Sequence, residues 1–222
     1  MKRMFAPLVV VVALLFVGAP YLIAQAPIES TMGLVQKIFY FHVPSWMAMY
    51  TAIAVCGVGS AMFLFRGNKA ADAYAVAGAE VAVLFGMMGL VSGPLWGRKA
   101  WGVWWVWDPR LTSALLMELI FIAYLLVRKY GGPGSEKLAA ATGLFGAATS
   151  PFVYKSVDIW RSQHPKTSVV PALLKGSMAG SEIPFMVSAF AFVLFATLLL
   201  MLRTTLAKRQ AALDALYLEY EE

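Results

Sequence analysis

Six apolar stretches of this sequence are each long enough, or nearly so, to cross about 30 Å of hydrocarbon as an α-helix. A membrane core offers no water to backbone N–H and C=O groups, so apolar runs of this length cross it as helices. The composition agrees, since 60% of the 222 residues are apolar, 14% are charged and the mean hydropathy is +0.71. We therefore predict an all-α integral membrane protein, with residues 1–222 forming a single six-helix transmembrane domain. The expected helices are Phe5–Ala24, Trp46–Phe65, Ala73–Leu95, Leu111–Val127, Leu138–Tyr154 and Ile183–Leu202, followed by a cytoplasmic tail helix over 203–222.

The first stretch also has features of a cleavable signal peptide, because basic residues precede it and Ala24-Gln25-Ala26 follows it. The apolar region of a signal peptide usually runs about 7–15 residues, and this one is longer. We therefore expect a retained transmembrane helix, with cleavage as the alternative.

Positive charge is distributed unevenly between the expected connections. If the amino terminus is inside, the inner segments carry ten Lys and Arg in 41 residues, and the outer segments carry eight in 64. This asymmetry places both termini in the cytoplasm and the Trp-rich segment between the third and fourth helices on the outer face. The net charge of +6 is explained by this topology signal and by contact with anionic lipid, so no nucleic-acid partner is expected.

The sequence lacks the motifs of several enzyme classes. The stretch GGPGSEK (131–137) lacks the Gly-Lys-Ser/Thr ending of a phosphate-binding Walker A loop, so ATP hydrolysis is expected in a partner. No His-Glu-x-x-His, Cys-x-x-Cys or Gly-x-Ser-x-Gly motif is present. Cys56 is the only cysteine, which excludes an intrachain disulfide.

All seven tryptophans lie in or beside the expected outer segments. An interfacial aromatic belt normally marks both membrane faces, so this one-sided set favours a flat aromatic platform for a planar, mostly apolar ligand. Three indoles and a carboxylate have the spacing i, i+3, i+4, i+7, and a helix along the interface would place them on one face. They are Trp101, Trp104, Trp105 and Asp108. Asp108 also precedes Pro109 as a helix N-cap would, and the two roles are compatible.

Both histidines are expected in outer segments, each four residues from a tryptophan: His42 from Trp46, and His164 from Trp160. Imidazoles from two separate segments can bind a metal from opposite sides. Such a site suits haem, which is planar, takes two axial ligands and carries propionates that cations can pair. The candidate cations include Arg98, Lys99 and Arg110. On the residues alone, a quinone, a lipid headgroup or a purely structural aromatic belt are the alternatives.

Two acidic residues, Glu80 and Glu118, fall within the expected third and fourth helices. A charge at the bilayer centre costs about 2.5–3.5 kcal/mol on insertion scales, so such residues usually face the bundle interior or a partner. We expect either protonated packing residues or polar contacts between subunits.

Three stretches resemble a known family. WGRKAWGVWWVWDPRLTS (96–113) resembles the tryptophan-rich WWD signature of haem-handling membrane proteins, in the form found in the cytochrome c maturation protein C (haem exporter protein C) family. FHVPSWM (41–47) and YKSVDIWRSQHP (154–165) resemble the two histidine-bearing outer loops of that family. The resemblance covers about Ile38 to Pro165, and the tryptophan-rich motif is highly specific.

The resemblance implies a six-helix protein of the bacterial inner membrane that binds haem b at its periplasmic face, non-covalently and in transit. His42 and His164 match the axial iron ligands of the family. The WWD segment is matched by Trp96, Trp101, Trp104, Trp105, Trp107 and Asp108. The family is not enzymatic. It passes haem to a periplasmic haem chaperone, alongside an ABC-type ATPase, a second membrane subunit and a small single-span subunit.

The alternative within the same superfamily is a cytochrome c synthase, which also has a WWD segment and attaches haem to apocytochrome. Proteins of that type are larger, and they tend to have an acidic residue near the point where this chain has DPRLTS (108–113). The short length and this stretch both favour the haem exporter type.

Overall fold

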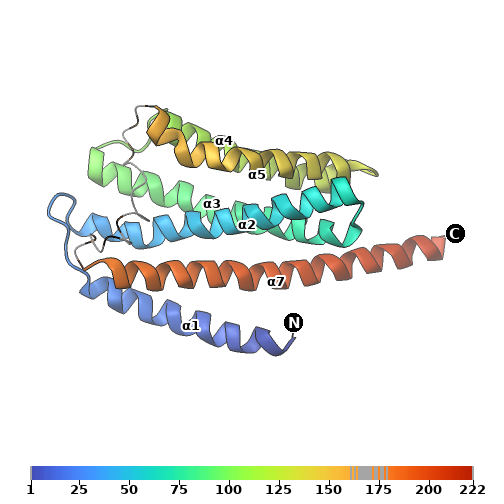
Figure 1. Ribbon diagram of the computed structural model, residues 1–222, viewed down its shortest axis with the longest axis horizontal. Coiled ribbons are helices and arrows are strands. Elements are labelled where there is room, and N and C mark those ends of the chain that lie inside the picture. Colours follow the sequence, from blue (N-terminus) through green and yellow to red (C-terminus); the bar gives the residue numbers. More distant parts are fainter. Residues whose placement is uncertain are drawn as a thin grey trace.

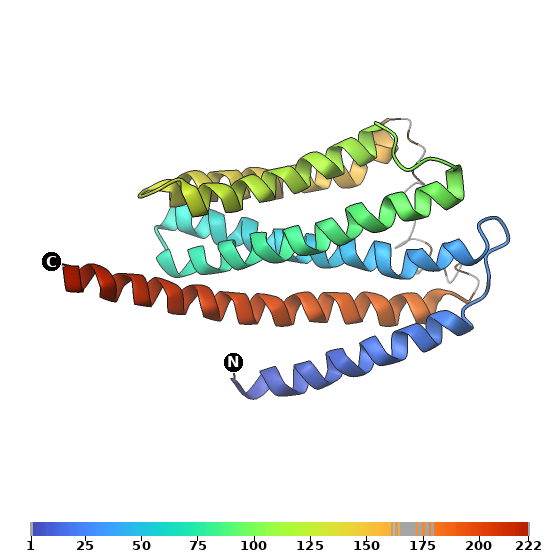
Figure 2. The same cartoon turned by 180° about the vertical axis from the view of Figure 1, so that it is seen from behind.

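A computed structural model describes residues 2–160, 162, 164, 172, 175, 178 and 180–221. The main helices run side by side in a bundle, as Figures 1 and 2 show from opposite sides. Helix α2 packs against α3 at the centre, α4 and α5 pair on one side of them, and α7 lies on the other side with α1 outermost. The elements are α1 (Lys2–Gln25), the short 3-10 helix η1 (Leu34–Ile38), α2 (Phe39–Arg66), α3 (Lys69–Trp101), α4 (Pro109–Tyr130), α5 (Ser135–Ile159) and α7 (Glu182–Glu221).

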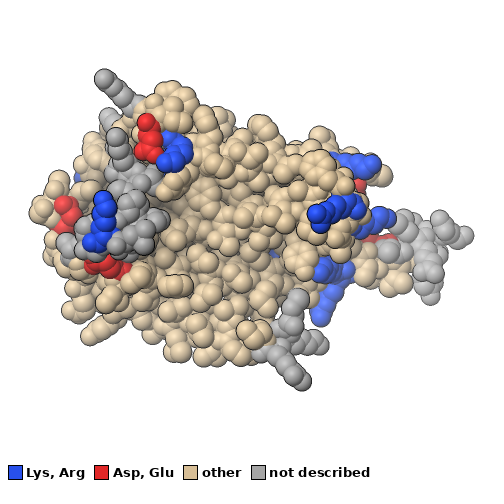
Figure 3. Space-filling view, in the orientation of Figure 1, with Lys and Arg blue, Asp and Glu red and all other residues tan. Residues whose placement is uncertain are grey.

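Five helices in the described part of the chain, α1, α2, α3, α4 and α7, are long and apolar enough to cross a membrane. Helix α5 has 25 residues, but its many Ala, Gly, Ser and Thr residues make it less apolar. On the face shown in Figure 3, charged side chains gather at the two ends of the bundle and uncharged surface lies between them. The described chain is therefore all-helical, with the apolar spans of an integral membrane protein.

Helices α2 and α3 are longer than the sequence predicted, because each continues through a proline. Helix α2 begins at Phe39 and contains Pro44, whereas the predicted start was Trp46. Helix α3 contains Pro94 and ends at Trp101, whereas the predicted end was Leu95. The predicted bounds lie next to these two prolines, but membrane helices tolerate proline where neighbouring groups compensate for the lost hydrogen bond. His42 therefore lies on a helix, and its predicted position in a loop is wrong.

Helix α7 is one continuous helix of 40 residues, so the predicted tail helix is its second half. This half is held against α3 by ionic contacts. The Arg203 guanidinium donates from Nε to Glu80 Oε2 at 2.6 Å and from Nη2 to Glu80 Oε1 at 2.5 Å. Lys208 Nζ lies 4.4 Å from the centre of the Tyr74 ring. Glu80 is thus paired within the chain.

The central pair of helices packs closely through small residues. A Cβ atom added to Gly78 of α3 would lie 2.5 Å from the backbone nitrogen of Cys56 in α2, so no larger residue fits there without a shift. Small residues of this kind let membrane helices approach until their backbones touch. At the end of the bundle where α3 begins and α4 ends, Arg128 of α4 pairs with Asp72 of α3, with Nη2 2.7 Å from Oδ2. These contacts fix α2, α3 and α4 relative to one another.

Glu118 of α4 lies inside the bundle and is 1% exposed. Its carboxyl group lies against Gly86, where an added Cβ atom would collide with it. Neither carboxyl oxygen has a hydrogen-bond partner among the residues that the structure describes. Of the two expectations for Glu118, packing inside the bundle is therefore the one that matches its position.

Candidate functional site

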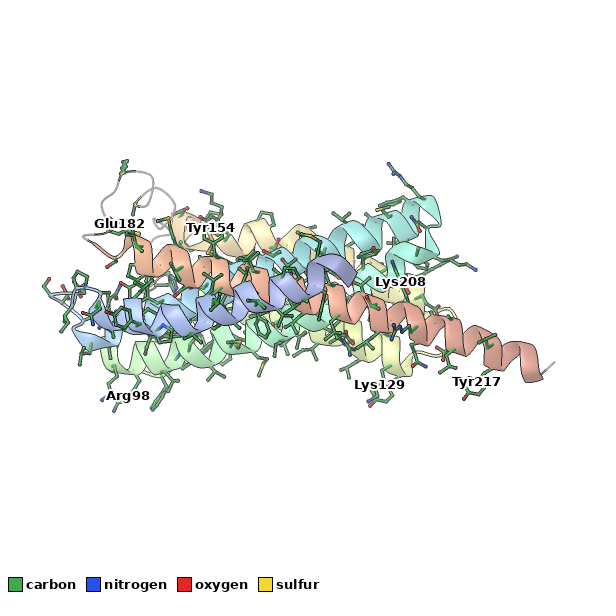
Figure 4. The ribbon with its side chains drawn as sticks, turned by 90° about the horizontal axis from the view of Figure 1, so that it is seen from below. Arg98, Lys129, Tyr154, Glu182, Lys208 and Tyr217 are labelled. Carbon is green, nitrogen blue, oxygen red and sulfur yellow. The ribbon has the colours of Figure 1, made fainter. Side chains whose placement is uncertain are left out.

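A cavity of about 240 Å³ opens at the end of the bundle where α3 ends and α4 begins. Its wall comes from α2, α3, the segment 102–108, the start of α4, the end of α5 and His164. Figure 4 shows Tyr154, which lines the cavity, at the same end as Arg98 and Glu182, with Lys129, Lys208 and Tyr217 at the other. Both His42 and His164 line this cavity, so the fold brings together the two histidines that lie 122 positions apart in the sequence.

The hydrogen bonds of Ser92 favour one position for the ring proton of His42. His42 is 7% exposed, and its Nδ1 lies 2.9 Å from the hydroxyl oxygen of Ser92 on α3. That hydroxyl has one proton, which it donates to backbone carbonyls of its own helix, at 2.7 Å from Met88 O and 3.3 Å from Gly89 O. We therefore assign the ring proton to Nδ1, from which it can be donated to Ser92 Oγ. In the neutral ring, Nε2 then carries the lone pair that can bind a metal.

Two indoles hold the His42 ring edge-on. The ring centroid of His42 lies 6.2 Å from that of Trp46 and 5.7 Å from that of Trp96, at interplanar angles of 78° and 79°. Helix α3 makes room for these rings with glycine. A Cβ atom added to Gly89 would lie 2.5 Å from Cε2 of Trp46, and one added to Gly93 would lie 3.3 Å from Cε1 of His42. The orientation of His42 is thus set by packing as well as by Ser92.

The Trp-rich segment does not form the helical face that its spacing predicted. Helix α3 ends at Trp101, where Gly102 takes a φ of +79°, and residues 102–108 are not helical. A positive φ suits glycine and ends the helix there, so the predicted common helical face is wrong. The loop nevertheless brings these residues to one cavity, which is lined by Trp96, Trp101, Trp104, Trp105 and Asp108. Trp107 is 76% exposed and packs edge-on against Trp105 instead.

Two indole N–H groups of the cavity wall are buried without an acceptor among the described residues. Trp96 Nε1 and Trp105 Nε1 have no hydrogen-bond partner within the described chain. A buried N–H group without an acceptor is costly, so these two groups are suited to an acceptor on a bound ligand.

Asp108 caps α4, as the sequence predicted, and it also makes a long-range contact. Its Oδ1 accepts a hydrogen bond from the backbone N–H of Leu111 at 2.9 Å, and its Oδ2 accepts one from the Ser162 hydroxyl at 2.6 Å. Ser162 Oγ in turn accepts from the backbone N–H of His164 at 3.0 Å. The Trp-rich segment is therefore linked to the segment that carries the second histidine.

The three candidate cations occupy different places. Arg110 lines the cavity, and its Nη1 donates to the backbone carbonyl of Val153 on α5 at 2.5 Å. Arg98 donates to the carbonyl of Gly102 at 2.6 Å and points away from the bundle in Figure 4. Lys99 is exposed, and neither Arg98 nor Lys99 lines the cavity.

Comparison with known proteins identifies the family of this chain. The model of the family described as Heme exporter protein C matches residues 1–216. The chain belongs to the haem exporter protein C family. It is 36% identical to Heme exporter protein C of Bradyrhizobium diazoefficiens over 197 residues, which cover 84% of this chain and 72% of that protein. It is 30% identical to Heme exporter protein C of Escherichia coli over 202 residues, which cover 86% of this chain and 78% of that protein.

A third relative is a mitochondrial protein of Marchantia polymorpha, named for cytochrome c biosynthesis. The chain is 30% identical to it over 173 residues, which cover 78% of this chain and 71% of that protein. The resemblance seen in the sequence is thus confirmed at the level of the haem exporter protein C family.

Several residues at the site of this protein were not predicted from the sequence. Ser92, which binds His42, is a polar residue in an otherwise apolar stretch, and that contrast could have marked it. Tyr50 and Tyr154 also line the cavity, with ring centroids 6.5 Å apart, but they come from different helices. Ser162 carries no signal in the sequence, since its partner Asp108 lies 54 positions away.

Proposed function

We propose that this member of the haem exporter protein C family binds haem b non-covalently in the cavity at the outer end, with His42 and His164 as axial ligands of the iron. The observation that carries the proposal is that both histidines line one cavity whose wall is rich in tryptophan and tyrosine. Family membership supports haem as the ligand, because the relatives in Bradyrhizobium and Escherichia carry the name Heme exporter protein C. Bis-imidazole ligation is one of the arrangements by which proteins hold iron in a planar macrocycle.

The residues of the cavity fit such a ligand in chemical terms. Nε2 of His42 carries a lone pair, because Nδ1–H is bound to Ser92. The indoles supply apolar walls that exclude water, and Trp96 Nε1 and Trp105 Nε1 supply two donors that a propionate oxygen can use. Among the described residues, Arg110 is the cation that lines the cavity, and it can pair with the same group. Cys56 does not line the cavity, which agrees with non-covalent binding.

The proposed function includes a topology. We place this protein in the bacterial inner membrane with six crossings, which are the five apolar helices and α5. Both termini then lie in the cytoplasm. Helix α5 packs against α4 and α2, and its 25 residues span about 37 Å at 1.5 Å per residue. The higher density of Lys and Arg in the inner connections supports this orientation. The cavity then opens on the periplasmic side.

We further propose that the protein delivers haem and does not attach it to apocytochrome. Trp104 and Trp107 are 58% and 76% exposed, so aromatic surface surrounds the outer end of the site where an acceptor could approach. The acceptor is a periplasmic haem chaperone. An ABC-type ATPase, a second membrane subunit and a small single-span subunit complete the complex, and the ATPase supplies the nucleotide chemistry for which this chain has no Walker A loop.

Absorption spectra of the purified protein, oxidised and reduced, test the proposal. We expect wild-type protein to carry low-spin haem with two histidine ligands, and His42→Ala and His164→Ala each to lose that signature and most of the bound haem. Lys37→Ala is the control, because Lys37 donates to the Ala24 carbonyl outside the cavity and should leave the spectrum unchanged.

Two results would overturn parts of the proposal. Wild-type spectra from both single histidine variants would remove the ligand assignment. A covalent adduct formed from haem and a Cys-x-x-Cys-His peptide, with no other maturation protein present, would indicate a synthase instead of a delivery protein.

A further inference from the structure

One carboxylate joins two segments of the outer end that are far apart in the sequence. Asp108 uses Oδ1 to accept from Leu111 N–H in the first turn of α4, at 2.9 Å. It uses Oδ2 to accept from the hydroxyl of Ser162, at 2.6 Å and 54 positions away. A hydrogen bond from a hydroxyl to a carboxylate at this distance is charge-assisted and stronger than a neutral one.

Ser162 passes this connection on to His164. A serine hydroxyl donates one hydrogen bond and can accept two. Here it donates to Asp108 and accepts from the backbone N–H of His164 at 3.0 Å, so one bond uses its proton and the other uses a lone pair. The backbone of His164 is thereby tied to the N-terminus of α4, whose Arg110 lines the same cavity.

The rigidity of α4 makes this connection useful for positioning. Helix α4 is anchored in the bundle by buried residues that include Met117 and Phe121, and at its inner end by the Arg128–Asp72 ion pair. His164, in contrast, lies in the connection between α5 and α7, outside both helices. A ligand residue outside regular structure holds its geometry when it is tied to a rigid element, because fewer backbone conformations have to be excluded on binding.

We propose that Ser162 is a positioning residue for the iron ligand His164, and that Asp108 acts on the site through Ser162. The inference rests on the proposed function of His164 and adds the reason why a carboxylate follows the tryptophans. Asp108 ends the Trp-rich segment, caps α4 and fixes the segment of the second histidine with a single side chain. The two parts of the site, which come from distant parts of the chain, are thus both attached to the first turn of α4.

The variants Ser162→Ala and Ser162→Thr, in the full-length purified protein, separate positioning from folding. Alanine removes both hydroxyl contacts and leaves the Asp108 cap on Leu111 in place, whereas threonine keeps a hydroxyl. Ser113→Ala is the matched control, because the Ser113 hydroxyl bonds to the Pro109 and Arg110 carbonyls in the same helix turn and does not touch His164.

Three measurements are made on each variant: the spin state of the bound haem, the rate of haem loss to apomyoglobin, and thermal unfolding. We expect Ser162→Ala to lose haem about tenfold faster, the size of effect that loss of one charge-assisted hydrogen bond gives, and to show a high-spin fraction. Ser162→Thr should stay within about twofold of wild type, and Ser113→Ala should match it. A purely structural role for Ser162 would lower thermal stability and leave the spin state unchanged.

The outcomes distinguish this inference from the proposed function. If wild-type protein binds no haem, or His164→Ala keeps the wild-type spectrum, the proposed function fails. If His164→Ala loses the low-spin signature and Ser162→Ala keeps both the wild-type spectrum and the wild-type rate of haem loss, positioning by Ser162 is overturned.

A second variant covers the case in which Ser162→Ala does not fold. Asp108→Asn keeps a side-chain oxygen that can cap Leu111 and removes the charged acceptor of the Ser162 hydroxyl. It should shift the spin state in the same direction as Ser162→Ala. A wild-type spectrum and rate in this variant would also overturn the inference.

Discussion

His42 can present Nε2 as a metal ligand because its other ring nitrogen is already bound. We assign the Ser92 proton to the Met88 or Gly89 carbonyl, which leaves the serine oxygen as the acceptor for Nδ1–H. A partner of this kind on the second ring nitrogen fixes the tautomer and the ring orientation of a metal-binding histidine, and its loss commonly costs 10–100-fold in metal affinity. A single hydroxyl on α3 therefore favours Nε2 as the atom of His42 that can bind a metal.

We predict that Ser92→Ala weakens haem binding about tenfold, because it leaves the buried Nδ1–H of His42 without its acceptor and permits the other tautomer. Titration of purified protein with haem measures the affinity, and the spectrum reports the ligation. Ser92→Thr keeps the hydroxyl and should restore most of the affinity.

Ser150→Ala is the control for this prediction, because the Ser150 hydroxyl makes the same kind of bond within its own helix, to the Ala147 carbonyl, outside the cavity. Equal affinities for Ser92→Ala, Ser150→Ala and wild type would show that Ser92 has no part in orienting His42.

At the scale of the elements, α3 forms the surface against which the ring side chains of α2 pack. Gly86, Gly89 and Gly93 lie along α3 where it meets Glu118, Trp46 and His42 respectively. Glycine in a helix interior is usually unfavourable by about 0.5–1 kcal/mol relative to alanine. Here it is needed because a side chain at these positions would occupy the space of a ring or a carboxyl group, and the cavity wall would be displaced.

We predict that Gly89→Ala destabilises the protein by about 1–3 kcal/mol and weakens haem binding, because its Cβ would lie 2.5 Å from Trp46 Cε2 and displace this indole, which packs edge-on against His42. Thermal unfolding in detergent and haem titration measure the two effects. Gly18→Ala in α1 is the matched control, since a Cβ at Gly18 meets no atom within 4 Å. That variant should be as stable as wild type or slightly more stable. An unchanged melting temperature for Gly89→Ala would mean that Trp46 can move away at no cost.

At the scale of the whole molecule, the bundle separates its chemistry by end. One end holds the cavity, both histidines and the Trp-rich segment, and the other holds the Arg128–Asp72 and Arg203–Glu80 ion pairs and the second half of α7. The surface between the ends lacks charge on the face shown in Figure 3. If α5 crosses the membrane with the five more apolar helices, all connections of the cavity end lie on one side.

Cysteine labelling with a membrane-impermeant maleimide tests this topology in intact cells. Cys56 is fully buried and should not react, so single cysteines can be added to the natural chain. We predict that Ser30→Cys and Lys155→Cys are labelled from the periplasm, and that Lys69→Cys reacts only after the cells are opened. If Lys155→Cys, like Lys69→Cys, reacted only after the cells were opened, α5 would not cross the membrane.

The membrane class, the apolar helices and several residues of the cavity wall were accessible from the sequence because they depend on local properties. Apolar length predicts a span, Asp-Pro predicts a helix start at Pro109, and the one-sided tryptophans with two histidines predict a platform with metal ligands. The helix bounds at Pro44 and Pro94 and the common face of Trp101, Trp104 and Trp105 were wrong. In these cases tertiary packing tolerates proline inside a helix, and a single glycine with positive φ interrupts the helical period.

The sequence by itself determined that this chain is a helical membrane protein, that its aromatic and imidazole groups gather at one end, and to which family it is similar. Only the tertiary structure decided which cation lines the cavity, which nitrogen of His42 is available, and that Asp108 is linked through Ser162 to His164. The physical reason is the sequence separation over which each property acts. Hydropathy and charge asymmetry are sums over neighbouring residues, whereas a hydrogen bond between residues 50 or 54 positions apart depends on how the helices pack.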